Sequence, residues 1–217
     1  VIDVRSPSEF ADDHIEGAIN LPALSDDERA VVGTLYKQTS AFAARKAGAA
    51  IMSRNIAHHL ETCLQDKPPS FRPLFYCWRG GQRSRAFALV LSEIGWTTHL
   101  LEGGYKTYRR DVLDKIKTLP EQLQLIIIAG RTGSGKTTLL QMLQKKQQQI
   151  LDLEELAAHR GSLLGQMPGR PQPGQRLFES RLVHKLMQFD TGTPVFVESE
   201  SSRIGNLQIP APLWRVM

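Results

Sequence analysis

Short apolar runs alternate with stretches of helical periodicity along the first 117 residues. Between the apolar runs, Ser6 is placed to cap a helical turn, residues 28–65 have a helical pattern, a helix over 83–94 ends at Gly95, and another continues through Lys117. The runs that predict strands are VIDV at 1–4, GAINLP at 17–22, RPLFYC at 72–77 and THLLEGG at 98–104. Strands that alternate with helices usually pair in parallel, so the pattern predicts a parallel sheet with helices on both faces.

The pattern is interrupted at residues 118–122 (TLPEQ) and then begins again. The elements expected after it are a buried strand at 123–130, a helix from Lys136, an extended segment at 150–153, a helical stretch, a loop rich in proline and glycine at 167–175, a helix at 176–189 and a strand at 194–198. We therefore expect an α/β chain with one domain over 1–119 and a second over 123–217. The second is small for a wound nucleotide-binding domain and the chain starts at Val1 inside a strand, so we expect a fragment whose second domain is incomplete at its C-terminus.

Composition indicates a globular protein with an anionic partner. Of its 217 residues, 41% are hydrophobic, and 27 lysines and arginines against 22 acidic residues give a net charge of +5. The basic residues are dispersed, so nucleic acid and small phosphorylated ligands fit equally well. No run approaches the ~20 apolar residues of a spanning helix, and no signal segment is evident, so we expect no membrane contact. Cys63 and Cys77 form no C-x-x-C pair, which favours a reducing cytoplasm, and Cys63 lies in a polar helical run where we expect a structural role.

The segment YCWRGGQRS places Cys77 between a strand and a helix, with the spacing C-x5-R to Arg83. Gly80 and Gly81 can adopt positive φ and turn backbone N–H groups inward, while the helix dipole, Arg79 and Arg83 add positive potential. These surroundings favour the thiolate and would equally hold a persulfide or selenide on Cys77. The alternative is a buried cysteine that ends a core strand, but it explains neither the glycines nor the arginines.

A strand, a glycine-rich loop and a helix follow one another at the start of the second domain. The loop matches the diphosphate-binding pattern G-x-x-x-x-G-K-[ST] with Gly130, Gly133, Ser134, Gly135, Lys136 and Thr137. The backbone N–H groups of residues 133–137 would surround a diphosphate, Lys136 would neutralise its oxygens, and Thr137 would ligate Mg²⁺.

A partner for that metal is expected at the end of a neighbouring strand. PVFVESES supplies Glu198 and Glu200 there. We expect this pair to provide an outer-sphere magnesium ligand or a base, with Glu198 the residue that joins Thr137 at the metal. Two solvated carboxylates after an edge strand are the alternative.

Residues 158–165 (AHRGSLLG) offer a second polar group at an expected helix end. His159, Arg160 and Ser162 are candidates for phosphate or tRNA contacts, although a histidine and an arginine that cap a helix C-terminus would give the same pattern. The second domain holds no recognisable aromatic motif for stacking RNA bases.

Four motifs of the first domain have the order and spacing of a rhodanese domain: DVRSPSEF, HIEGAINLP, the C-x5-R loop and LEGGY. The resemblance implies a cysteine that carries transferable sulfur. Common single-domain rhodaneses have a loop one residue shorter, and the longer loop also occurs in related phosphatases and arsenate reductases. It suits a larger anion, so two hypotheses follow: chemistry on a tetrahedral oxyanion, or transfer of selenium in place of sulfur.

The whole chain resembles the bacterial tRNA 2-selenouridine synthase family, because CWRGGQRS and GRTGSGKT are followed by DLEELAAHRGSLLG, QPGQRLFE and VESESSRIG. The resemblance implies a rhodanese-like parallel sheet followed by a P-loop NTPase-like α/β domain. It also implies that selenium replaces sulfur in wobble 2-thiouridine of tRNA, with selenophosphate as donor, and that the same nucleoside is S-geranylated from geranyl diphosphate. Gly174 and Ser199 depart from the family pattern, which has serine and an acidic residue there.

The resemblance also implies residue roles. Cys77 would accept or deliver selenium while Arg79 and Arg83 hold the charged donor, and Lys136 and Thr137 would bind the diphosphate of the prenyl donor. Geranyl on the thiocarbonyl sulfur makes that sulfur a better leaving group, so a selenium nucleophile can attack C2 of the uridine. A selenophosphate-producing enzyme is an expected partner.

Two other classes of protein remain open. The first domain is also consistent with a C-x5-R phosphatase or arsenate reductase fused to a P-loop kinase or NTPase, although no general acid for a phosphatase can be identified in the sequence. A nucleotide-switched binding module is the non-enzymatic alternative, and the intact cysteine and loop arginines count against it.

Overall fold

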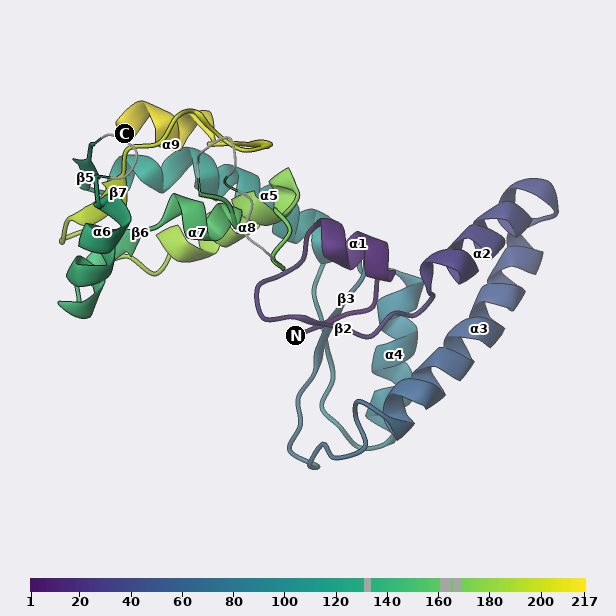
Figure 1. The fold of residues 1–217 in the computed structure, drawn as a ribbon. Helices are drawn as coiled ribbons and strands as arrows, with labels where there is room; N and C mark the ends of the chain where they lie inside the picture. The colour runs from purple at the N-terminus through teal and green to yellow at the C-terminus, as the bar shows by residue number, and fades with distance from the viewer. Residues whose placement is uncertain (131–133, 161–164, 166–168) are drawn as a thin grey trace. The chain divides into compact units, whose positions relative to one another are not determined.

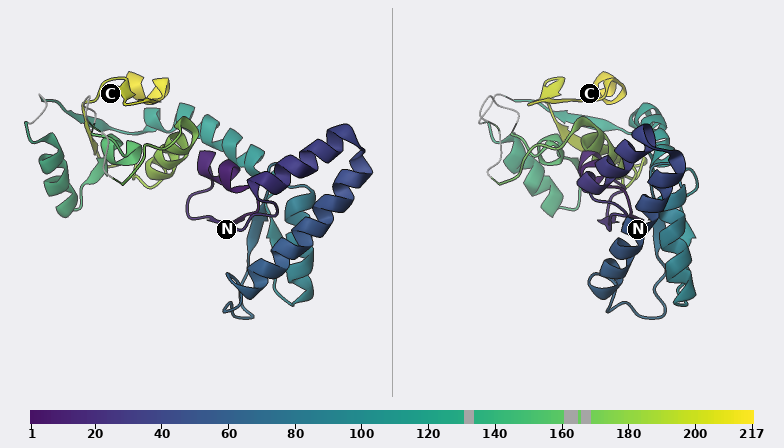
Figure 2. Two further views of the ribbon diagram at one scale, coloured as in Figure 1. Left: turned by 45° about the vertical axis from the view of Figure 1, so that its right-hand side comes forward. Right: turned by 90° about the vertical axis from the view of Figure 1, so that its right-hand side faces the viewer.

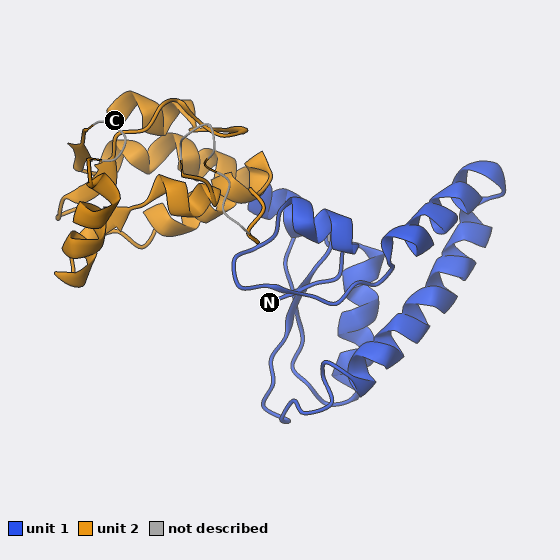
Figure 3. Ribbon diagram, in the orientation of Figure 1, with its two compact units in different colours: residues 1–109 blue, residues 110–217 orange. Residues whose placement is uncertain are grey.

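The computed structural model describes residues 1–130, 134–160, 165 and 169–217. The chain divides into two compact units, Val1–Arg109 and Arg110–Met217 (Figure 3). It passes from the first unit to the second within helix α5 (Gly104–Thr118). Each unit has its own parallel sheet and its own buried core, so the predicted α/β architecture with two sheets and flanking helices is confirmed.

The sheet of the first unit has the order β2-β1-β3-β4, and every neighbouring pair is parallel. Its strands are β1 (Ile2–Asp3), β2 (Ile19–Asn20), β3 (Leu74–Tyr76) and β4 (His99–Leu100). Each lies inside a run that the sequence pattern predicted as a strand. Apolar side chains of β1 and β3 pack with those of helix α4 (Gln82–Glu93) in one core that includes Ile2, Phe75 and Phe87.

Helices α1 (Pro7–Asp12), α2 (Asp26–Gln38) and α3 (Ala41–Glu61) occupy the N-terminal half of this unit (Figure 1). The single helical stretch predicted over 28–65 is in fact two helices, α2 and α3, which lie side by side in all views (Figure 2). The break occurs because the Ser40 hydroxyl accepts a hydrogen bond from the Ala43 N–H at 3.0 Å and so caps a new helix.

A buried polar network joins strand β1 to the start of α5. Arg5, which is 1% exposed, donates to the Asp3 carboxylate at 2.6 Å and to the Asp13 carbonyl at 2.6 Å. The Tyr105 hydroxyl donates to Asp13 at 2.8 Å, and the Arg5 guanidinium lies 3.9 Å from the centre of the Tyr105 ring. Buried charges need such partners, and these partners fix the position of the α5 N-terminus, which contacts the cysteine loop.

The sheet of the second unit has the order β5-β7-β6, and both pairs are parallel. Its strands are β5 (Leu125–Ile128), β6 (Gln149–Leu151) and β7 (Val195–Glu198). The helices are η1 (Pro120–Gln122), α6 (Lys136–Lys145), α7 (Leu153–Ala157), α8 (Gln175–Leu186) and α9 (Ala211–Val216) (Figure 1). Because the strands are parallel, the residues that follow β5, β6 and β7 meet at one edge of the sheet.

The pattern of apolar residues did not predict the elements after residue 200. Strands β8 (Arg203–Ile204) and β9 (Leu207–Gln208) form an antiparallel pair, and α9 follows. Unlike the equally short strands of the first sheet, these two do not lie inside a longer run predicted as a strand, so the pattern gave no sign of them. In the described part of the chain, no helix has the length and apolar character needed to span a membrane.

Candidate functional site

Cys77 follows strand β3 directly, and its side chain is the centre of a hydrogen-bonded loop. The residue is 3% exposed, and its Sγ accepts a hydrogen bond from the Gly81 N–H at 3.2 Å. The Ser84 hydroxyl lies 3.3 Å from the same sulfur. Gly80 has a φ of +66°, as its glycine identity allows, whereas Gly81 has a φ of −93° and caps α4. The backbone N–H groups of Gly81 and Ser84 both favour a charge on the sulfur, in line with the predicted inward-facing amides, whereas the positive φ considered for both glycines is found only at Gly80.

The N-terminus of α5 holds the cysteine loop in place through backbone hydrogen bonds. The N–H groups of Tyr105 and Lys106 donate to the carbonyls of Cys77 and Trp78 at 2.9 and 3.1 Å. Gly104, with a φ of +60°, lies so close that a Cβ at this position would overlap the Cys77 carbonyl oxygen. The LEGGY motif thus provides a close approach of backbone to backbone that a larger residue would prevent.

The environment of Cys77 lowers the pKa of its thiol. Burial acts in the opposite direction and raises the pKa, but the hydrogen bonds from Ser84 and Gly81 and the charge of Arg83 together outweigh it. Hydrogen bonds to a thiolate favour the charged form. The loop therefore prepares an anion on this sulfur.

The sulfur lies at a pocket of about 460 Å³. The pocket is lined by Glu9, Arg29, Cys77, Trp78, Arg79, Gly81, Gln82 and Arg83. The three residues predicted as catalytic, Cys77, Arg79 and Arg83, are thus brought together. Cys63 is exposed and does not line this pocket.

Glu9 is a residue of this pocket that the sequence analysis missed. Its carboxylate accepts a hydrogen bond from Arg83 at 2.9 Å and another from the Ser6 N–H at 3.1 Å. Burial raises the pKa of Glu9, but the hydrogen bond and charge of Arg83 lower it below its usual value overall. Glu9 therefore stays ionised at neutral pH and neutralises part of the charge of Arg83. The S-x-x-E capping box of α1 was the only signal of its position.

The glycine loop follows β5, and its described part has the geometry of a strand-to-helix turn. Gly135 has a φ of +85° and precedes α6, whose first residue is Lys136. The Lys136 ammonium donates to the Gly130 carbonyl at 2.9 Å, and a Cβ on Gly130 would lie 2.5 Å from the Ser134 hydroxyl oxygen. Gly133 lies outside the described residues.

A pocket of about 410 Å³ lies at this end of the sheet. Thr137, Gln141, Asp152, Glu154, Glu155 and Arg160 line it. His159 is buried, so of the predicted contact residues the exposed Arg160 is better placed to reach a phosphate group. Ser162 lies outside the described residues.

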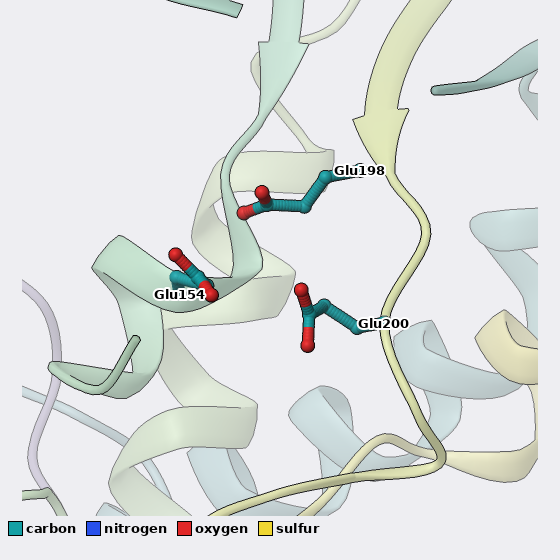
Figure 4. A group of neighbouring side chains, drawn as sticks. All are labelled: Glu154, Glu198 and Glu200. Atoms are coloured by element: carbon teal, nitrogen blue, oxygen red, sulfur yellow. The ribbon is translucent and has the colours of Figure 1, made fainter. Parts of the chain in front are cut away.

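Three carboxylates converge beside this pocket (Figure 4). Glu198 ends β7, Glu200 lies two residues beyond it, and Glu154 lies on α7, which follows β6. One oxygen of each lies within 4.8 Å of the others. Burial and the charges of Glu154, Asp152 and Glu200 raise the pKa of Glu198 to about 8. Glu154 was not predicted: it lies three residues after β6, and only the pairing of β6 with β7 in the folded sheet brings it to Glu198.

These residues fit the magnesium ion predicted from the sequence. Carboxylate oxygens are the ligands that hard divalent cations prefer, and two oxygens on opposite sides of a cation bound at about 2.1 Å are about 4.2 Å apart. Adjacent ligands of the same cation are only about 3.0 Å apart, so the three oxygens of this carboxylate cluster, which lie within 4.8 Å of one another, must move closer together to share one cation. Glu198 also keeps one oxygen, Oε1, without a hydrogen-bond partner among the described residues.

Two known families match the two parts of the chain. Residues 1–111 match the family described as "Rhodanese-like domain", and residues 123–217 match the "tRNA 2-selenouridine synthase AAA domain". Whole-chain relatives are the tRNA 2-selenouridine synthases of Nitrosomonas europaea, 41% identical over 97% of this chain and 55% of the relative, and of Nitrosomonas eutropha, 38% identical over 100% and 56%. The enzyme of that name from Bdellovibrio bacteriovorus is 39% identical over 97% and 56%.

The chain thus spans little more than half the length of the curated relatives it matches. The match runs through both units, with the cysteine loop in the first matched region and the glycine loop and carboxylates in the second. The residues that converge in each unit, and the similarity along the whole chain, lead to one assignment: this chain belongs to the tRNA 2-selenouridine synthase family.

Proposed function

We propose that this chain takes part in the replacement of sulfur by selenium in wobble 2-thiouridine of tRNA. Family membership supports the reaction, and the hydrogen-bonded Cys77 beside Arg79 and Arg83 is the observation that supports a chalcogen site in this chain. The net charge of +5 suits a polyanionic substrate such as tRNA.

In this proposal the selenium donor binds in the pocket of about 460 Å³ beside Cys77, which we call the cysteine pocket. Selenophosphate is an anion, and Arg79 and Arg83 line the pocket from which it would approach the Cys77 sulfur. The N–H of Gly81 and the hydroxyl of Ser84, which stabilise a thiolate, would also stabilise a selenide anion bound at this place. Cys77 and the loop then hold the selenium for delivery: water attacks phosphorus, the P–Se bond breaks, and hydrogen selenide leaves with the electron pair as the nucleophile, so selenium keeps its oxidation state and no S–Se bond forms.

The glycine loop binds geranyl diphosphate. Lys136 exchanges its contact with the Gly130 carbonyl for contacts with the diphosphate oxygens. Thr137 lines the adjacent pocket of about 410 Å³, and the N-terminus of α6 adds backbone N–H groups that donate to the diphosphate. The thiocarbonyl sulfur of 2-thiouridine forms a bond to C1 of the geranyl group as the bond from C1 to diphosphate breaks. Diphosphate carries away the electron pair, and the proton on N3 of the uridine is lost to water.

The second step replaces the sulfur. A selenium nucleophile adds at C2 of the S-geranylated uridine, and the C2–S bond breaks so that geranylthiolate leaves with the electron pair. Geranylation matters because a thiolate bonded to carbon leaves as a monoanion, whereas the unmodified thiocarbonyl sulfur would leave as a dianion. The two steps need no oxidant or reductant.

The proposal is tested by incubating the protein with thiolated tRNA, geranyl diphosphate and selenophosphate, followed by mass spectrometry of the released nucleosides. We expect Cys77→Ser to abolish selenation and to retain geranylation, and Lys136→Ala to lose geranylation. Lys136→Ala should regain selenation when the tRNA is supplied already geranylated. Cys63→Ser is the matched control and should behave as the unchanged protein does. Normal selenation by Cys77→Ser, or normal geranylation by Lys136→Ala, would contradict the assignment.

The phosphatase alternative has weaker support. A C-x5-R phosphatase needs an acid that protonates its leaving group, and the carboxyl group that lines the cysteine pocket belongs to Glu9. Arg83 lowers the pKa of Glu9, which opposes that role at neutral pH.

A further inference from the structure

An apolar groove of about 770 Å³ is lined by side chains of helices α2, α3 and α4 in the first unit (Figure 1). This volume lies within the range of about 300–1,000 Å³ that is usual for sites of small molecules. Ala44 is buried, and Met52 and Ala86, which also line the groove, pack against the hydrophobic core of the unit. The floor of the groove is therefore fixed by the core itself.

Small residues of α3 leave the groove open. Ala44 and Gly48 lie one turn apart on the face of α3 that lines it, and Ala49 follows Gly48. Tyr36 and Leu89 line the groove as well, although they are 63% and 62% exposed. Large apolar side chains that remain in contact with water at a hollow of this kind are typical of a ligand site, because a bound apolar group would remove that contact.

The groove is continuous with the cysteine pocket. Gln82 and Arg83 line both, and they form the first turn of α4. The N-cap of that helix, Gly81, donates its N–H to the Cys77 sulfur at 3.2 Å. One ligand can therefore occupy both spaces, with a polar part near the sulfur and an apolar part in the groove.

The charged side chains that line the groove are all basic. They are those of Arg45, Arg83 and Arg85. A free hydrocarbon would gain nothing from three guanidinium groups, whereas an apolar chain joined to a polyanion suits both the groove and the arginines. The ligand that fits has a reactive polar group for the cysteine pocket, an apolar chain for the groove and phosphate groups for the arginines.

We propose that this groove receives the geranyl group of S-geranylated 2-thiouridine in tRNA while selenium is introduced at C2. The assignment rests on the proposed function, in which C2 and its sulfur must come to the selenium nucleophile in the cysteine pocket. The geranyl chain is bonded to that sulfur, so it needs an apolar space beside the pocket. The groove also gives the selenation step a preference for geranylated over unmodified 2-thiouridine, because burial of the chain contributes to binding.

The first test measures binding of two nucleosides to the 217-residue chain by equilibrium dialysis. S-geranyl-2-thiouridine and S-methyl-2-thiouridine share the heterocycle and the thioether, and they differ only in the apolar chain. We expect the geranylated nucleoside to bind at least about tenfold more tightly. Ala49→Phe fills the groove and should reduce this preference to about twofold or less. Ala50→Phe is the matched control and should keep the preference, because Ala50 is exposed on the same helix but does not line the groove.

A second pair of variants changes polarity instead of volume. Leu89→Gln places an amide in the groove, whereas Val90→Gln changes the next residue, which is exposed but lies outside it. With geranylated tRNA and selenophosphate as substrates, Leu89→Gln should raise KM for the tRNA by about fivefold and leave kcat within about twofold, as expected for lost binding of a substrate group. Val90→Gln should change neither constant. Both positions are exposed, so neither variant disturbs the core.

Three results would overturn the inference. They are equal affinity of the unchanged chain for the two nucleosides, a preference that survives in Ala49→Phe, and a dimer of the unchanged chain that Leu89→Gln converts to monomers, since a second copy would then cover the groove. Each would leave the proposed function intact provided that the unchanged protein selenates geranylated tRNA. Failure of that reaction, together with tight binding of the geranylated nucleoside that Ala49→Phe abolishes, would reject the proposed function and still support a geranyl site in the groove.

Discussion

The Cys77 sulfur of the first unit and the Glu198 carboxylate of the second are both nearly inaccessible to solvent, yet their surroundings differ in kind. The sulfur accepts a hydrogen bond from the Gly81 N–H, lies within hydrogen-bond distance of the Ser84 hydroxyl and is close to the charge of Arg83. The carboxylate is surrounded by other acidic groups and keeps one oxygen without a partner. The pKa of Cys77 is therefore lowered and that of Glu198 is raised.

The difference lies in whether the neighbouring groups favour or oppose a negative charge on the buried side chain. In the first unit, hydrogen bonds from Ser84 and Gly81 and the charge of Arg83 favour a negative charge on Cys77, as the proposed chalcogen chemistry requires. The carboxylate cluster has the opposite imbalance, because its acidic groups repel one another and raise the pKa of Glu198 to about 8. If the comparison is right, substitutions around Cys77 should change the reactivity of the thiol, whereas substitutions in the cluster should change metal binding and stability.

The largest effect is expected from Gly104→Ala, which disturbs the support of the cysteine loop. The new Cβ would overlap the Cys77 carbonyl oxygen, in addition to the cost of a positive φ of about 1–2 kcal/mol. Gly17→Ala is the control, because Gly17 has a φ of +74° but nothing within 4 Å of its added Cβ. Chemical denaturation should show that Gly104→Ala lowers the free energy of unfolding by at least about 2 kcal/mol more than Gly17→Ala. Equal losses would mean that the close approach has no energetic role.

Ser84→Ala should have the next largest effect, and on reactivity. It removes a hydrogen bond to the sulfur, which raises the pKa of the thiol and leaves less thiolate at neutral pH. Alkylation of Cys77 by iodoacetamide at pH 7 should slow by roughly tenfold, the size expected for a hydrogen bond to a charged group. The measurement is made in a Cys63→Ser background. Ser92→Ala, whose hydroxyl donates to a backbone carbonyl in the same helix, should leave the rate unchanged.

In the carboxylate cluster, Glu200→Gln should stabilise the cation-free protein. It removes a negative charge that raises the pKa of both Glu198 and Glu154, so folding no longer has to bring that charge close to them. Denaturation in the presence of a chelator should show a gain of about 0.5 kcal/mol. Added Mn²⁺ should reverse the order of the two proteins, and a loss of stability in chelator would contradict the repulsion that we infer.

The smallest effect is expected from Glu9→Gln in the cysteine pocket. Glutamine can keep the contact with the Ser6 N–H, but it no longer neutralises Arg83. The thiolate of Cys77 should therefore be favoured, and alkylation at pH 7 should accelerate by about twofold, as expected for a partly exposed ion pair. A slower reaction would indicate that Glu9 positions Arg83 rather than screening its charge.

Local pattern predicted the parts of the sites that are contiguous in the sequence. Cys77 and Arg83 share one loop, and Gly130 and Lys136 share another, so spacing alone indicated their chemistry. The contacts that pattern could not predict join distant positions: Glu9 meets Arg83 across 74 residues, and Gly104 meets the Cys77 carbonyl from α5. Glu154 joins Glu198 because β6 pairs with β7, and this pairing becomes visible only in the folded sheet.

The central claim, that the loop around residue 77 stabilises an anion on sulfur, is tested most directly by titration of the thiolate absorbance near 240 nm. The Cys63→Ser protein is followed from acid to alkaline pH in its folded state and again in denaturant. Hydrogen bonding lowers the pKa of the folded thiol, so the absorbance should rise at a lower pH in the folded protein than in the unfolded chain. A folded thiol that titrates at the same pH as the unfolded one, or at a higher pH, would contradict the account.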